Sequence, residues 1–225
     1  MPITRSGTAT GEGFFRSCQG KVMKKWVYAF TEGDGKNKKL LGGKGANLCE
    51  MTQIGLNVPP GFVISTEACL HYLDSAAHEL PSEVMGQVRE QMLKLEQATG
   101  KGFGDAENPL LVSVRSGSAL SMPGMMDTIL NLGLNSQTLQ GEIAHTGDAR
   151  FGYDAYRRFI QLFGKVAMGV PDELFDTEFE MVKQAARVTE DVGLSAENLQ
   201  EICDRFLQLF QAHTGRPFPE DPYEQ

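Results

Sequence analysis

The hydrophobic pattern of this 225-residue chain changes at about residue 135, and this change limits the folds available to it. Between Trp26 and Leu134, short apolar runs typical of strands alternate with helical patterns. After Asn135, apolar residues recur at three- and four-residue intervals, the period of helices that bury one face. The sequence therefore predicts an α+β, mixed α/β lobe at 24–134 and a helical subdomain at 135–216.

The first lobe is expected to contain three strands and at least three helices. A helix over Ala46–Met51 and another after the Ser65–Thr66 cap are predicted, the second with Cys69 as a small core residue and running on through Leu70 and Leu73. Pro81 begins a third helix with an apolar stripe. The predicted strands are 27–30, 62–64 and 110–114, and the stripe of the third helix is Val84, Val88, Met92 and Leu95.

Two apolar stripes mark the helical subdomain. Pro171 and Ser195 each begin a helix, and acidic residues follow them at the positive end of the helix dipole. The stripes, including Cys203, are expected to form the core. They are Tyr156, Phe159, Ile160, Phe163 and Val166, and then Leu199, Ile202, Cys203, Phe206, Leu209 and Phe210.

Charge is unevenly distributed along the chain. The net charge of −8 argues against a nucleic-acid partner, because phosphate backbones require a basic face. Residues 171–225 hold 13 acidic and 4 basic side chains, so the rest of the chain is nearly balanced. An anionic ligand is therefore expected in the N-terminal half. No apolar run has membrane-spanning length, which argues against a membrane partner.

The first 23 residues predict a disordered leader, since they show no periodicity and are rich in Gly, Ser and Thr. They lack the apolar stretch of a secretory signal, but their composition also resembles an organelle transit peptide. A cytoplasmic location is expected, with an organelle left open. Cys18, Cys49, Cys69 and Cys203 have neither metal-ligand nor disulfide-framework spacing, so no metal site is predicted from them.

A glycine-rich segment at residues 42–45 stands between an apolar pair and a helical pattern. The N–H groups and positive dipole at such a helix start suit a phosphate, and Lys44 adds a charge. The segment is not a Walker A loop, because Lys39 and Gly45 occupy the positions of its first Gly and its Ser or Thr. It is not a G-x-G-x-x-G loop either. A tight turn with a solvated lysine remains the alternative.

A second candidate segment follows the apolar run at 110–114. Arg115 ends this run, and its guanidinium can bind phosphate in a bidentate manner. A loop of Ser, Gly, Met and Pro then extends to Thr128 and offers hydroxyl and N–H donors. A structural arginine beside a glycine turn is the alternative. Together the two segments predict the ligand-binding residues Gly43, Lys44, Gly45, Arg115, Ser121, Met122, Gly124, Met126, Asp127 and Thr128.

These motifs, in this order, resemble the N-terminal nucleotide-binding domain of the pyruvate, phosphate dikinase family. The similarity covers about residues 24–225 and includes Tyr156-Arg157-Arg158-Phe159 and Pro217-Phe218-Pro219. Its most specific part is the Met-Pro-Gly-Met-Met-Asp-Thr string at 122–128. The related phosphoenolpyruvate synthases share the Gly-Gly-Lys and Val-Arg-Ser elements but have a different loop.

The resemblance implies the first lobe of an ATP-grasp domain with a helical subdomain. It implies that Lys44 and Arg115 neutralise the phosphates of ATP, that the loop 121–128 closes over them, and that Mg²⁺ accompanies the nucleotide. The family's metal-binding acids lie in a second ATP-grasp lobe, and residues 217–225 are expected to be the linker to that missing lobe. The full-length family is commonly dimeric.

No histidine resembles the phosphorylated histidine of the family, so no catalytic residue is assigned. His71, His78, His145 and His213 are expected to be structural or on the surface. The resemblance thus implies an ATP-binding part of a phosphotransferase that is inactive without the phosphohistidine and pyruvate-binding domains. Two alternatives stay open, namely a part of a phosphoenolpyruvate synthase-type water dikinase and a non-catalytic regulatory or interaction module.

Overall fold

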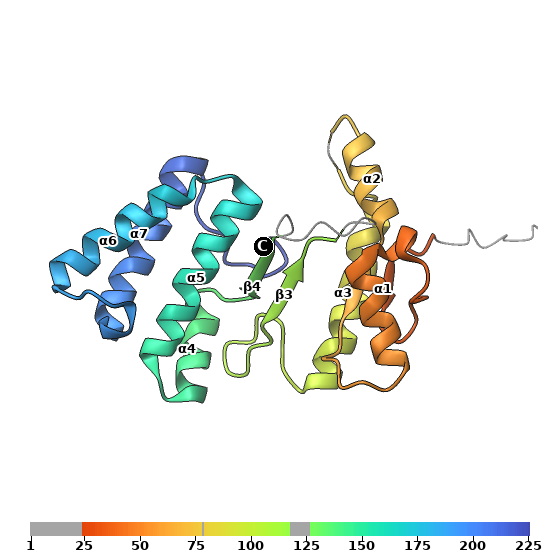
Figure 1. The fold of residues 1–225 in the computed structure, drawn as a ribbon, viewed down its shortest axis with the longest axis horizontal. Coiled ribbons are helices and arrows are strands. Elements are labelled where there is room, and N and C mark those ends of the chain that lie inside the picture. Colours follow the sequence, from red (N-terminus) through yellow and green to blue (C-terminus); the bar gives the residue numbers. More distant parts are fainter. Residues whose placement is uncertain (1–23, 78, 118–126) are drawn as a thin grey trace, which may run out of the picture.

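The computed structural model describes residues 24–77, 79–117 and 127–225, which form two lobes side by side (Figure 1). The strands at 112–115 and 128–132 pack with the helices after residue 135, so the second lobe includes them, whereas the sequence predicts them in the 24–134 lobe. The first lobe therefore contains two strands and three helices, and the second contains two strands, four α-helices and one 3₁₀ turn. In chain order the elements are β1 (Val27–Ala29), α1 (Lys38–Gln53), β2 (Phe62–Ile64), α2 (Thr66–Asp74), α3 (Ser82–Thr99), β3 (Val112–Arg115), β4 (Thr128–Leu132), α4 (Ser136–Thr146), α5 (Ala149–Met168), α6 (Asp172–Ala186), η1 (Asp191–Gly193) and α7 (Ala196–Thr214).

Each lobe holds one two-stranded antiparallel sheet. In the first lobe β1 pairs with β2, and Val27 lies opposite Ile64. In the second lobe β3 pairs with β4, with an irregularity in register between Val112 and Val114. The expected mixed α/β composition is confirmed, and helices dominate it.

The first lobe has two small hydrophobic clusters. α3 and the start of α2 pack against β1 around Trp26, whose side chain is buried. α1 packs against β2, with Ala46 and Cys49 completely buried beside Leu41. The full clusters are Trp26, Val27, Ala68 and Val84, and then Leu41, Ala46 and Cys49.

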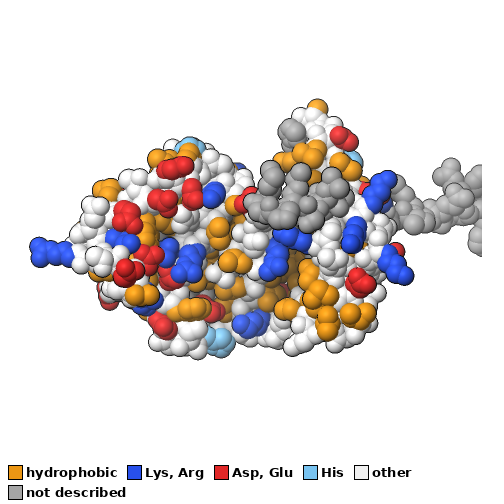
Figure 2. Space-filling view, in the orientation of Figure 1, with side chains coloured by type: hydrophobic (Ala, Val, Ile, Leu, Met, Phe, Trp, Pro, Cys, Tyr) orange, Lys and Arg blue, Asp and Glu red, His pale blue; other side chains and the backbone are white. Residues whose placement is uncertain are grey.

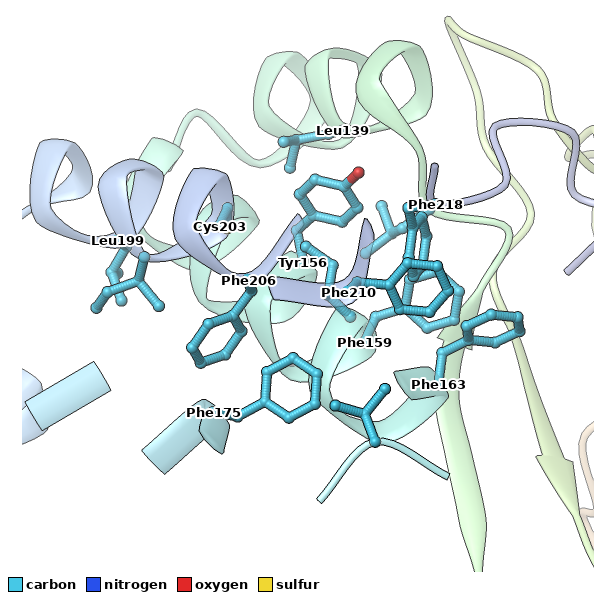
Figure 3. Close-up of a cluster of buried hydrophobic side chains, with 14 of the residues drawn as sticks. Leu139, Tyr156, Phe159, Phe163, Phe175, Leu199, Cys203, Phe206, Phe210 and Phe218 are labelled. Carbon is cyan, nitrogen blue, oxygen red and sulfur yellow. The ribbon is translucent and has the colours of Figure 1, made fainter. Parts of the chain in front are cut away.

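The second lobe has one large core, in which α5 packs against β4, α4, α6 and α7. Figure 3 shows the aromatic rings of α5, α6 and α7 converging on one another. Ile129 and Leu132 of β4 and Leu134 belong to the same core, so β4 packs with the helices. The predicted apolar stripes are confirmed as buried or partly buried.

The segment after α7 is packed against this lobe. Phe218 is 6% exposed and its ring lies 5.1 to 5.5 Å from the rings of Phe159, Phe163 and Phe210. The Glu220 carboxylate accepts hydrogen bonds from the backbone N–H and the hydroxyl of Ser136, at the start of α4. Residues 217–225 are therefore held along the second lobe.

Several helix starts follow the predicted capping chemistry. Ser195 caps α7 in a reciprocal capping box, and Pro171 precedes α6 as expected. Asn135 forms a similar box at α4, where its side chain accepts from two backbone N–H groups. Ser65 stands at the start of α2 as predicted, but its buried hydroxyl makes no capping hydrogen bond.

The expected core position of Cys69 is wrong. α2 buries only Ala68, and Cys69, Leu70 and Leu73 are exposed. The predicted helix is present, but it buries a smaller face against the lobe than its number of apolar residues suggests. None of the helices among the described residues is both long and apolar enough to span a membrane.

Candidate functional site

The glycine segment at 42–45 breaks α1 into two helical pieces. Gly42 has φ 68° and ψ 165°, a conformation that disfavours side chains with a Cβ, so the second piece begins at Gly43. The first N–H groups of a helix have no intrahelical partner and carry the positive end of the dipole. The predicted helix start is therefore present at Gly43 and Lys44, although a helical turn from Lys38 precedes it.

Two contacts hold this helix start against the rest of the lobe. A Cβ on Gly45 would lie 2.8 Å from Cγ1 of Val63, so the absence of a side chain lets α1 approach β2 closely. The Thr66 hydroxyl donates to the carbonyl of Lys39 at 2.6 Å, and the carbonyl of Leu40 lies 3.2 Å from it. The last carbonyls of the first helical piece therefore have a partner from α2. This fixes the direction in which the second piece starts.

Arg115 lies at the end of β3, directly opposite Thr128 of β4. The backbone N–H and the hydroxyl of Ser116 both donate to the carbonyl of Asp127, each at 3.2 Å. The structure thus brings together three of the predicted residues, namely Arg115, Asp127 and Thr128. The other predicted loop residues, Ser121, Met122, Gly124 and Met126, lie outside the described residues.

Lys44 and Arg115 are the two candidate phosphate-binding cations, and they belong to different lobes. Within the described residues neither side chain has an ion-pair or hydrogen-bond partner. In residues 127–225, by contrast, each Lys and Arg side chain except Arg187 has a partner. Figure 2 shows basic side chains on this face of both lobes. A ligand that touched both cations would lie between the lobes.

A hollow of about 520 Å³ lies elsewhere, between β4 and α5. Its apolar floor includes Leu130 and Phe151, and its basic residues are already paired. Arg158 contacts Asp154 at 2.8 Å, and Lys165 contacts Asp172 at 2.6 Å. None of the predicted ligand-binding residues lines this hollow.

The described part of the chain has no cluster of three or more His, Cys, Asp or Glu side chains arranged for a metal ion. Cys49, Cys69 and Cys203 are free thiols. Burial raises the pKa of the Cys49 thiol, and it raises the pKa of Cys203 to about 12, so these two thiols are poor metal ligands.

The described histidines are exposed. His71 packs edge-on against Trp26, and a ring nitrogen of His145 lies 3.2 Å from the Asn108 side-chain oxygen. His213 is exposed as well, and the prediction of structural or surface histidines is confirmed for these three. His78 lies outside the described residues.

A glycine-started helix and a strand-end arginine are both features at which proteins commonly bind anions, and here they lie in different lobes. Comparison with known proteins is more specific. Residues 38–85, which contain the whole helix start, match the family described as pyruvate phosphate dikinase, AMP/ATP-binding domain.

Relatives extend this match to most of the chain. The chain is 52% identical over 199 residues to pyruvate, phosphate dikinase of Entamoeba histolytica and 47% identical over 204 residues to that of Clostridium symbiosum. These alignments cover 88% and 90% of this chain but 22% and 23% of the relatives. A chloroplastic pyruvate, phosphate dikinase of Zea mays is 45% identical over 91% of this chain and 22% of its own length.

The chain is therefore homologous to part of the pyruvate, phosphate dikinases, and it spans a little over a fifth of their length. The resemblance seen in the sequence motifs is confirmed.

Proposed function

We propose that this chain supplies the phosphate-binding lobe of an ATP-grasp nucleotide site in a pyruvate, phosphate dikinase. The whole enzyme would convert ATP, pyruvate and phosphate to AMP, phosphoenolpyruvate and diphosphate. The observation that carries this proposal is the helix start at Gly43 and Lys44, which lies inside the segment that matches the AMP/ATP-binding family.

Each proposed role follows from the chemistry of the residue. Backbone N–H groups at Gly43 and Gly45 approach the ATP phosphates, because glycine leaves the backbone open. Lys44 and Arg115 neutralise phosphate charge, which is how proteins accelerate most phosphoryl transfers. The loop residues Ser121, Met122, Gly124, Met126, Asp127 and Thr128 close over the nucleotide.

Mg²⁺ is part of the proposal because polyphosphates are bound with it. The described acids form no cluster that fits a metal site, so its protein ligands would come from another part of the enzyme. The phosphohistidine and pyruvate-binding domains, and any homodimer contact, would likewise lie outside this lobe. Lys44 and Arg115 would act on the phosphates directly.

The sharpest test joins residues 24–225 to the remainder of the Clostridium symbiosum relative. We expect AMP formation that depends on both pyruvate and phosphate. Lys44→Ala and Arg115→Ala should each lower the rate by about 10²-fold or more, as the loss of a transition-state charge contact does.

Lys101→Ala is the matched control, because Lys101 is exposed and its side chain also has no described partner. It should retain full activity. AMP formation that does not require phosphate would favour the water-dikinase alternative. Full activity in both Lys44→Ala and Arg115→Ala would refute the phosphate roles.

A further inference from the structure

The two lobes have separate cores, so the angle between them depends on a few contacts. No buried cluster contains residues of both lobes. The element pairs that pack extensively all lie within one lobe. The positions of Lys44 and Arg115 relative to each other are therefore set by contacts at the boundary.

The helix α3 meets the second lobe at two points on one face. Near its end, the Glu96 carboxylate accepts a hydrogen bond at 2.7 Å from the backbone N–H of Phe103, whose side chain packs against the core of the second lobe. Two turns earlier, the guanidinium carbon of Arg89 lies 3.9 Å from the centre of the Tyr223 ring. Seven helical residues span about 10 Å. Two contacts at this separation fix the direction of the α3 axis relative to the second lobe, whereas a single contact would let α3 rotate about it.

The Tyr223 ring is carried firmly by the second lobe. It stands edge-on to Phe103, with ring centres 5.1 Å apart. The Tyr223 backbone N–H donates to the Asp221 side chain at 2.8 Å. The Gln225 side chain accepts from the N–H of Gly133 and donates to the carbonyl of Leu134, both at 2.9 Å. The ring therefore cannot shift without disturbing this segment.

The direction of α3 controls the position of Lys44. α3 packs on β1, β1 pairs with β2, and α1 packs on β2 through the Gly45–Val63 contact. These contacts link α3, β1, β2 and α1 into one packed unit. A rotation of α3 about its Phe103 contact would therefore move Lys44 relative to Arg115, which belongs to the other lobe.

We propose that Tyr223 is a positioning residue, whose ring between Arg89 and Phe103 fixes the angle between the lobes that carry Lys44 and Arg115. Its effect on nucleotide affinity rests on the proposed function, whereas its effect on the lobe angle does not. The ring carries this role, because the Tyr223 hydroxyl has no hydrogen-bond partner within the described residues.

The test measures the distance between the lobes by pulsed electron spin resonance. One label is placed on the exposed Cys69 of α2 and the other on His213→Cys of α7, in a Cys18→Ser background. Tyr223→Ala should broaden the distance distribution, and Tyr223→Phe should restore the wild-type width. Glu224→Ala, at an exposed neighbouring position, should have no effect.

Arg89→Ala provides a second route if Tyr223→Ala fails to fold. Arg89 is exposed on α3, so its removal leaves both cores intact and should broaden the distribution to a similar degree. An unchanged distribution in Arg89→Ala or in folded Tyr223→Ala would overturn the proposal.

Binding of a fluorescent ATP analogue in the presence of Mg²⁺ gives the functional consequence. Tyr223→Ala and Arg89→Ala should weaken it about three- to tenfold, and Tyr223→Phe should not. If the wild-type chain does not bind the analogue, the proposed ATP function loses support while the distance measurement still decides the role of Tyr223. Wild-type affinity in both alanine variants, with broadened distances, would refute the link between lobe angle and nucleotide binding.

Discussion

Replacement of Phe218 by alanine should destabilise the second lobe and leave the first lobe unchanged. Phe218 lies after the last helix, yet only 6% of it is exposed. Its ring is within 5.1 to 6.5 Å of four other rings, those of Tyr156, Phe159, Phe163 and Phe210. The segment that carries it is therefore part of the helical core.

The expected loss can be worked from this environment. A buried Phe→Ala change costs about 3 to 5 kcal/mol, of which part is the cavity that remains. Phe218 comes from an irregular segment that can partly collapse into the space, so we expect a value of about 3 kcal/mol. With a urea m-value of about 2 to 3 kcal/mol/M, the unfolding midpoint should fall by about 1 to 1.5 M.

Two spectroscopic probes separate the lobes in this assay. Trp26 is the single tryptophan and is buried in the first lobe, so its fluorescence reports on that lobe. Circular dichroism reports mainly on the second lobe, whose four α-helices contain more residues than the three α-helices of the first. Phe218→Ala should shift the dichroism transition and leave the Trp26 transition in place. Phe151→Ala, at a residue that is 51% exposed, should shift both by less than about 0.5 M.

Two results would contradict this reasoning. Equal small shifts for Phe218→Ala and Phe151→Ala would show that the aromatic contacts of Phe218 do not support the core. A Trp26 transition that moves together with the dichroism signal would show that the lobes unfold as one unit, against the separation of their cores.

Three further predictions concern single side chains. The Lys165 hydrogen bond lowers the pKa of Asp172, so this carboxylate stabilises the fold above the unfolded value near 4, and its contribution is lost as the pH falls through the lowered pKa. Asp172→Asn should lower the free energy of unfolding in urea by less than about 1 kcal/mol at pH 7, and by progressively less as the pH falls below about 4. In a Cys18→Ser variant, a thiol reagent at pH 8 should modify Cys69 quickly and Cys203 only after unfolding, as mass spectrometry can show. Asn135→Ala should cost about 1 to 2 kcal/mol in thermal unfolding, because it removes a buried helix cap.

The sequence was most informative where local chemistry decides the structure. β2 spans the predicted residues 62–64, and the helices α6 and α7 begin after Pro171 and Ser195 as expected. Proline, capping side chains and long apolar stripes act within a few residues, so they can be recognised without knowledge of the fold. The large core of the second lobe was predicted for the same reason.

The prediction failed where packing partners decide the structure. The sequence predicts a loop up to Thr128 and misses β4, because this strand is stabilised by pairing with β3 and by burial against α5. The apolar pattern of α2 predicts a core position for Cys69, but no element among the described residues covers that side of the helix. Both cases depend on contacts with residues distant in sequence.

The candidate site likewise has one feature that local sequence predicts and others that depend on distant contacts. The helix start at Gly43 could be inferred from the glycines and the following pattern, whereas the break at Gly42 also depends on the close packing of Gly45 against Val63. The contact between Arg89 and Tyr223 left no sequence signal, because a surface arginine and a tyrosine 134 positions later show no pattern together.

The pairing of charges offers a physical reason why an anion would bind at the boundary of the lobes. In residues 127–225 acidic side chains pair with five of the eight Lys and Arg side chains, and the excess acid repels a polyphosphate. Lys44 and Arg115 lack such partners among the described residues and lie where glycine, Ser116 and backbone N–H groups are close. Arg115 is exposed and Lys44 partly exposed, and an unpaired cation that reaches water costs the fold little. The fold can therefore leave these two cations available for a ligand, and under the proposed role of Tyr223 the boundary contacts of α3 would set how far apart they are held.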